Sequence, residues 1–125
     1  MKIGIADPQV RVRFGLRILL EEQSGWTVIG EATDTQELLT FLRVSCPDLV
    51  LIDMDLPDMP IDIILRLLRE QYPSLLVMLM SGRQELVQPA LNAGADGFAS
   101  KMESPDKLLN LIQALHARKV ESAKV

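Results

Sequence analysis

A group of aspartates at the end of one apolar segment is the part of this sequence best suited to chemistry. The segment, residues 49–52, is an unbroken Leu-Val-Leu-Ile, and Asp53 follows it directly. Asp55, Asp58 and Asp62 come soon after, with no lysine or arginine among them. Carboxylates this close repel one another unless a cation or a proton is shared between them. The cluster therefore predicts a metal site or phosphate chemistry at the end of this segment.

The apolar segment has the features of a strand in a parallel sheet. It is short and lies between Pro47 and Pro57, which is typical of a strand buried on both faces. Four other segments are also strand-like, and each of the five is followed by a segment with helical spacing of apolar residues. The expected strands are residues 2–6, 26–32, 49–52, 75–80 and 95–100. The expected helices begin near Gln9, Asp34, Ile61, Glu85 and Ser104, and the last ends near Arg118, before a frayed tail or linker at 119–125.

Several residues predict where the helices begin and end. Asp34 is expected to cap the second helix, with Glu37 as its capping-box partner. Pro60 is expected at the first position of the third helix. Pro89 removes one amide donor from the fourth helix, which is therefore expected to be kinked or to begin late. Gly94 is expected to end that helix.

Polar side chains stand at the ends of four of the expected strands. Alternating strands and helices form a parallel sheet with helices on both faces, and ligands bind such sheets beyond the carboxyl ends of the strands. Asp7 and Asp53 follow the first and third strands. Ser81 and Lys101 follow the fourth and fifth. We therefore expect these four side chains to meet in one functional site.

Length and composition restrict the class of protein. The chain has 125 residues, of which 48% are hydrophobic, and this suits one domain with a real core. A net charge of −4 with interspersed signs argues against direct nucleic-acid binding by this domain. Cys46 is the single cysteine, which excludes an internal disulfide; we expect it to be a small buried side chain in a reducing compartment. With neither a signal-peptide pattern nor an apolar run of membrane-spanning length, the expectation is a soluble cytoplasmic domain.

Three stretches carry a resemblance to a known family. Residues 5–16, 50–59 and 93–101 resemble, in order and spacing, the receiver domain of two-component response regulators. The likeness extends over essentially the whole chain and is closest to the branch whose receivers precede a helix-turn-helix DNA-binding module. It implies a flavodoxin-like (βα)5 fold with strand order 2-1-3-4-5 and a receiver domain at residues 1–118.

The resemblance implies a role for each residue of the expected site. Asp53 would accept a phosphoryl group from the phosphohistidine of a sensor histidine kinase. Asp7, Asp53 and the main-chain carbonyl of Asp55 would surround a Mg²⁺ ion, and Lys101 would pair with phosphate oxygens. The physical chemistry agrees, because a carboxylate that attacks phosphorus needs its charge neutralised more than it needs a base. The domain would thus be a signalling phosphoacceptor, with at most self-catalysed phosphotransfer and dephosphorylation.

The resemblance also implies a switch and its partners. Ser81 would hydrogen-bond the phosphoryl group, and Phe98 would change rotamer when Ser81 moves. The surface of the fourth helix, fifth strand and fifth helix would then bind an output domain, attached or separate, or a second copy of the chain. On the first helix, Val10, Phe14 and Ile18 form a second apolar stripe that is either the margin of the core or a docking face.

One position departs from the family pattern. The family usually has two successive acids after the first strand, and here the second is Pro8. The second acid is a metal ligand in the family, so Mg²⁺ binding is expected to be weak. The carboxylate of Asp55 could replace it, or Arg83 could hold Asp55 in a salt bridge; the sequence leaves both open. A receiver that has lost phosphorylation and works as an interaction module is therefore an alternative.

Two enzyme or carrier classes share parts of this pattern. Asp53 and Asp55 after an apolar strand, with Ser81 and Lys101 later, also resemble the motifs of haloacid-dehalogenase phosphatases. Those enzymes need an acidic cluster after the lysine, and no acid beyond Lys101 lies at an expected strand end. A flavin carrier on the same fold would need a Ser/Thr/Gly-rich phosphate loop after the first strand, and none is present.

Overall fold

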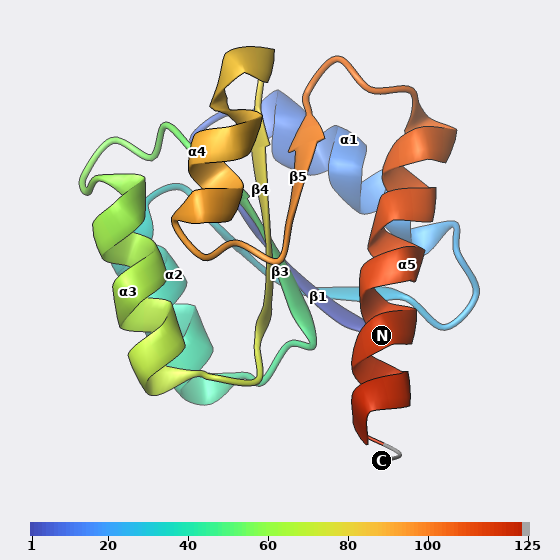
Figure 1. Ribbon diagram of the computed structural model, residues 1–125. Coiled ribbons are helices and arrows are strands. Elements are labelled where there is room, and N and C mark those ends of the chain that lie inside the picture. Colours follow the sequence, from blue (N-terminus) through green and yellow to red (C-terminus); the bar gives the residue numbers. More distant parts are fainter. Residues whose placement is uncertain (124–125) are drawn as a thin grey trace.

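Five parallel strands form one sheet in the computed structural model, which describes residues 1–123 (Figure 1). The order is β2-β1-β3-β4-β5, as the family resemblance implies. The strands are β1 (Lys2–Ala6), β2 (Thr27–Ala32), β3 (Leu49–Asp53), β4 (Leu76–Ser81) and β5 (Gly97–Ser100).

Helices cover both faces of this sheet. In Figure 1, α1 and α5 lie on one face, and α2, α3 and α4 lie on the other. A 3₁₀ turn, η1 (Gln84–Leu86), leads directly into α4. The helices are α1 (Val10–Glu21), α2 (Thr35–Val44), α3 (Ile61–Gln71), α4 (Val87–Asn92) and α5 (Pro105–Ala123).

The central strand β3 contributes to two hydrophobic cores. Leu49 and Leu51 pack with residues of α1 and α5, whereas Val50 and Ile52 pack with residues of α2, α3 and α4. Successive side chains of a strand point to opposite faces, so both faces of β3 must be apolar. All four side chains are at most 1% exposed, and burying each contributes about 1.5–3 kcal/mol. This burial explains why the strand has no polar residue before Asp53.

The helix signals in the sequence are largely confirmed. Oδ1 of Asp34 accepts a hydrogen bond from the Glu37 amide at 2.8 Å, as expected of a cap. The fourth helix begins late, at Val87, so Pro89 is its third residue, where an amide would have no acceptor within the helix. Gly94 follows α4 with φ of +105°, which ends the helix as expected.

Other boundaries differ from the sequence-based prediction. Pro60 precedes α3 in an extended conformation and only its carbonyl joins the helix, accepting from the amides of Ile63 and Ile64. Strands β2 and β5 begin at Thr27 and Gly97, later than predicted, and β4 runs from Leu76 to Ser81, one residue later at each end.

Two expectations about single segments are wrong. Helix α5 continues past Arg118 to Ala123, so residues 119–123 are helical and do not form a frayed tail. Residues 124–125 lie outside the described part of the chain. Cys46 is exposed, because it lies in the connection between α2 and β3, and connections run over the protein surface. No helix among the described residues is long and apolar enough to cross a membrane.

Candidate functional site

Four polar side chains meet at the carboxyl edge of the sheet. Asp7 follows β1, Asp53 ends β3, Ser81 ends β4, and Lys101 follows β5. Because the strands are parallel and in register, their ends lie side by side. Asp7 is 2% exposed, Asp53 6% and Ser81 1%, so the site sits at the edge of the core. The structure brings together the four residues that the sequence placed at strand ends.

The ammonium group of Lys101 bridges the two buried carboxylates. Its Nζ lies 2.8 Å from Oδ2 of Asp7 and 3.3 Å from Oδ2 of Asp53. Burial lowers the pKa of Lys101, but the hydrogen bond to Asp7 and the charges of both carboxylates outweigh burial and raise the pKa above its ordinary value. Lys101 therefore stays charged at neutral pH and neutralises part of the site.

Asp53 is less completely compensated. Burial raises the pKa of Asp53, and the amide of Asp55 and the charge of Lys101 offset only part of that rise. The other carboxylate oxygen of Asp53 and that of Asp7 each accept a hydrogen bond from an amide. Oδ1 of Asp53 accepts from the Asp55 amide at 3.3 Å, and Oδ1 of Asp7 accepts from the Gln9 amide at 2.8 Å. Each carboxylate is thus held in place by one amide and by Lys101.

Among the described residues, the hydroxyl oxygen of Ser81 takes part in hydrogen bonding as an acceptor. Its Oγ accepts a hydrogen bond from the Arg83 amide at 3.0 Å, and its carbonyl accepts from the Lys101 amide at 2.8 Å. The second contact fixes the backbone of Lys101 against β4. The first uses Ser81 as an acceptor, so its O–H remains able to donate to an anion.

Asp55 does not complete the group of carboxylates. Its Oδ1 lies 2.9 Å from the Arg83 guanidinium, and both side chains are more than half exposed. The sequence left open whether Asp55 joins the metal site or forms this salt bridge, and in the structure it forms the salt bridge. Within residues 1–123, no three acidic, histidine or cysteine side chains lie close enough together to hold a metal ion.

The remaining oxygen donors still suit a weakly held Mg²⁺. Magnesium commonly binds through one or two carboxylates and keeps several waters. The contact of Lys101 with both Asp7 and Asp53 shows that one cation can reach both carboxylates. A metal would have to share these oxygens with Lys101. The donor set therefore fits Mg²⁺, but with a competing cation already in the site.

Asp58 and Asp62 lie outside this site. Asp58 reaches across to α2, where Oδ1 and Oδ2 accept the amides of Thr35 at 2.9 Å and Gln36 at 3.1 Å. Slight burial raises the pKa of Asp58, but these amide hydrogen bonds outweigh it and lower the pKa. Asp62 is in the first turn of α3. The four clustered aspartates therefore have separate roles, and no sequence signal marked the contact of Asp58 with α2.

Phe98 lies beside an open space between two helices. It is half-buried on β5 against the core formed with α2, α3 and α4. A hollow of about 270 Å³ adjoins it, lined also by Gln84 and Val87 on one side and by Lys107 and Leu111 of α5 on the other.

The second apolar stripe on α1 is exposed to solvent. The exposed fractions of its side chains are 66% for Val10, 65% for Phe14 and 49% for Ile18. It is therefore not part of the core margin. A groove of about 220 Å³ between α1 and the start of α5 is lined by Arg11, Gly15 and Lys101, among other residues. Lys101 thus belongs both to the site and to this groove.

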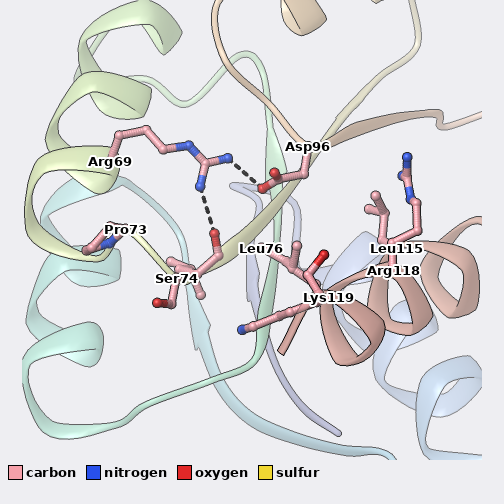
Figure 2. A pocket seen from close by; sticks show the side chains of 10 residues that line it. Arg69, Pro73, Ser74, Leu76, Asp96, Leu115, Arg118 and Lys119 are labelled. Carbon is pink, nitrogen blue, oxygen red and sulfur yellow. Dashed lines mark hydrogen bonds and ion pairs between the residues drawn. The ribbon is translucent and has the colours of Figure 1, made fainter. Parts of the chain in front are cut away.

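A larger hollow, about 650 Å³, lies at the amino edge of the sheet (Figure 2). Arg69 of α3 donates to the Leu75 carbonyl at 2.8 Å and forms an ion pair with Asp96. Asp96 also accepts the Val77 amide at 2.8 Å. These contacts tie α3 to the starts of β4 and β5. The sequence analysis did not single out this network.

Comparisons with known proteins agree on one family. The model of the response regulator receiver domain matches residues 3–113. The chain is 36% identical over 115 residues to an uncharacterized transcriptional regulatory protein, YhcZ, of Bacillus subtilis, covering 90% of this chain and 54% of that protein. The chain thus spans about half the length of the curated relatives that it matches.

Solved structures give the same result. A two-component response regulator of the LuxR family from Aurantimonas is 30% identical, with a TM-score of 0.86 and coverage of 93% of this chain and 84% of that one. A CheY-like receiver domain protein from Methanospirillum hungatei is 25% identical, with a TM-score of 0.85 and coverage of 97% of each chain. With the fold and a family-model match over most of its length, the chain belongs to the response regulator receiver domains of two-component systems.

Proposed function

We propose that this domain accepts a phosphoryl group on Asp53 from the phosphohistidine of a sensor histidine kinase. The observation that carries the proposal is the buried Asp53 carboxylate at the strand end, bridged to Asp7 by Lys101. In the transfer, a carboxylate oxygen of Asp53 bonds to phosphorus while the bond from phosphorus to the histidine nitrogen breaks. The imidazole leaves with that electron pair, and the aspartyl phosphate remains.

Each residue of the site has a distinct task in this transfer. Lys101 contacts Asp53 at present and would neutralise the oxygens of the arriving phosphoryl group. The Ser81 hydroxyl would donate a hydrogen bond to one of those oxygens. Asp7, Asp53 and the main-chain carbonyl of Asp55 would hold Mg²⁺, which when bound supplies further neutralising charge. Because Pro8 offers no side-chain oxygen, we expect this metal to be held weakly.

We further propose that the kinase docks beside α1. The exposed stripe of Val10, Phe14 and Ile18 offers apolar area to a partner, and the nearby groove is lined by Lys101 itself. A partner bound there would hold its phosphohistidine close to the acceptor. We infer that the domain is a signalling phosphoacceptor of the cytoplasm, with at most self-catalysed phosphotransfer and dephosphorylation.

The output surface is proposed to be α4, β5 and α5. Phosphorylation would draw Ser81 inward and let Phe98 move toward the adjoining hollow. Helix α4 has only six residues, and its Val87 and Leu91 are about 40% exposed, so its opening and ordering cost little. The partner would be an output module such as a DNA-binding domain, attached or separate, or a second copy. The names of the curated relatives as transcriptional regulators support this direction.

Mass spectrometry of the intact protein tests the acceptor. Incubation with acetyl phosphate and Mg²⁺ should add one phosphate, and Asp53→Asn should abolish the addition. Asp62→Asn, which removes an aspartate in the first turn of α3, is the matched control and should label normally. Labelling that persists in Asp53→Asn would show that the acceptor is another residue.

Amide hydrogen exchange tests the switch. Protection of residues 82–98 should rise on phosphorylation, while residues 49–52 stay protected throughout. Equal exchange at verified phosphate occupancy would contradict the switch.

One observation favours a second candidate, an interaction module that works without phosphorylation. The Asp55 carboxylate is engaged by Arg83, and Pro8 replaces an acid, so among the described residues the carboxylates of Asp7 and Asp53 remain for a metal, and Lys101 contacts both. Absence of labelling at every Mg²⁺ concentration would favour this candidate.

A further inference from the structure

A salt bridge joins two loops at the acceptor site. The guanidinium of Arg83, in the loop between β4 and α4, lies 2.9 Å from Oδ1 of Asp55, in the loop between β3 and α3. The two side chains are 56% and 60% exposed. Exposed ion pairs contribute little to stability, so this contact can open at little cost.

Asp55 is the next acidic residue after Asp53, and its backbone contacts the acceptor. Its amide donates to Oδ1 of Asp53, so its backbone is already fixed beside the acceptor. Pro8 cannot supply a ligand, and within the described chain no third acidic side chain joins Asp7 and Asp53. The carboxylate that could do so is held by Arg83 instead.

Arg83 reaches Asp55 from an anchored backbone. Its amide donates to Oγ of Ser81 at 3.0 Å, and the 3₁₀ turn η1 begins at the next residue. This anchor does not involve the guanidinium group. The salt bridge can therefore open by rotation of the Arg83 side chain, without disturbing the end of β4.

We propose that Arg83 and a divalent cation compete for the carboxylate of Asp55. While Arg83 holds Asp55, the site offers only the carboxylates of Asp7 and Asp53. When the salt bridge opens, Asp55 adds a third carboxylate and the ion is held more tightly. Arg83 thus sets the metal affinity of the site. The inference concerns the site of the proposed function, and it is tested by metal binding alone.

The test is a Mg²⁺ titration of the unphosphorylated domain, followed by amide chemical shifts at constant ionic strength. Arg83→Ala should tighten Mg²⁺ binding about two- to fivefold, the factor that corresponds to the loss of one exposed ion pair. Arg83→Gln should act in the same direction. Arg66→Ala removes the same charge from an exposed position on α3 and should leave the affinity unchanged. The amide spectra also report whether each variant is folded.

The double variant separates competition from simple charge repulsion. In the background of Asp55→Ala, Arg83→Ala should no longer tighten binding, because there is no carboxylate to release. An equal gain with and without Asp55 would overturn the proposal, as would an unchanged affinity in Arg83→Ala or no measurable Mg²⁺ binding by any variant. Failure of the proposed function would differ: Asp53 of the unaltered chain would take no phosphate at saturating Mg²⁺, whatever the titrations show.

Discussion

At the amino edge of the sheet Arg69 donates to two main-chain carbonyls and pairs with Asp96, whereas at the carboxyl edge Lys101 is shared between Asp7 and Asp53. The arginine has one acid and fixed carbonyl partners, so its charge and its donors are matched. The lysine has two acids, both almost fully buried. The charge at the carboxyl edge is therefore only partly neutralised. Burial raises the pKa of Asp53, and the charge of the Asp7 carboxylate adds to that rise.

This difference separates a structural network from a chemical one. The network around Arg69, in which the charge and the donors have partners, is not stabilised further by a ligand. It serves to hold α3, β4 and β5 together. An excess of carboxylate attracts a cation and keeps a nucleophilic oxygen ready.

The largest effect is expected for Lys101→Met. Without the ammonium, the transferring phosphoryl group loses the contact with Lys101, and the labelling rate should fall about a hundredfold, as when one stabilising group is removed from other active sites. The labelling rate would be measured by quenching the reaction at successive times and determining the intact mass of the protein. Lys107→Met, an exposed lysine on α5, is the control. A rate within twofold of the unaltered chain would show that Lys101 is not needed.

Arg69→Ala should destabilise the fold by about 2 kcal/mol, because it leaves Asp96 and two carbonyls without their charged donor. Chemical denaturation would measure the loss, with Arg66→Ala on the same helix as the control. Labelling of Asp53 should remain normal at a temperature where the variant is folded. A labelling defect with full stability would contradict the structural role of the amino edge.

Asp58→Ala should cost about 1 kcal/mol, the usual effect of removing a helix cap, because the amides of Thr35 and Gln36 lose their acceptor. The pKa of Asp58 is lowered in the folded state, so its contribution is present above the unfolded value near 4 and disappears as pH falls through the folded value. Denaturation at pH 7 and at pH 3 would measure both. A loss of equal size at the two pH values would contradict the role of the ionised carboxylate.

The smallest effect on stability is expected for Asp53→Asn, and it is an increase rather than a loss. A carboxyl group whose pKa is raised by folding destabilises the native state when ionised, so the amide should raise the melting temperature slightly at pH 7. The gain should vanish as pH falls below the unfolded value near 4, where Asp53 is protonated in both states. Asp96→Asn should instead lower the melting temperature. Equal signs for the two variants would remove the contrast between the edges.

The amino-acid sequence alone predicted the sheet and the residues at its carboxyl edge. Residues 49–52 are apolar on both faces, and this pattern occurs where a strand has helices on both sides. Parallel strands end at the same edge, so Asp7, Asp53, Ser81 and Lys101 had to lie close together. Local rules for caps and prolines likewise predicted the cap at the start of α2 and that α4 would be kinked or begin late.

Contacts between segments could be decided only by the tertiary structure. The path of the loop that crosses from β3 to α3 decides two contacts. It determines whether Asp55 faces a metal or Arg83, and it brings Asp58 to the start of α2. The same applies to the ion pair of Arg69 with Asp96, residues 27 positions apart, and to the exposure of Cys46. Periodicity and spacing report which face of an element is buried and where its backbone begins and ends. They carry no information on which of several charged side chains reaches a given partner, because that depends on distances set by the packing of the whole chain.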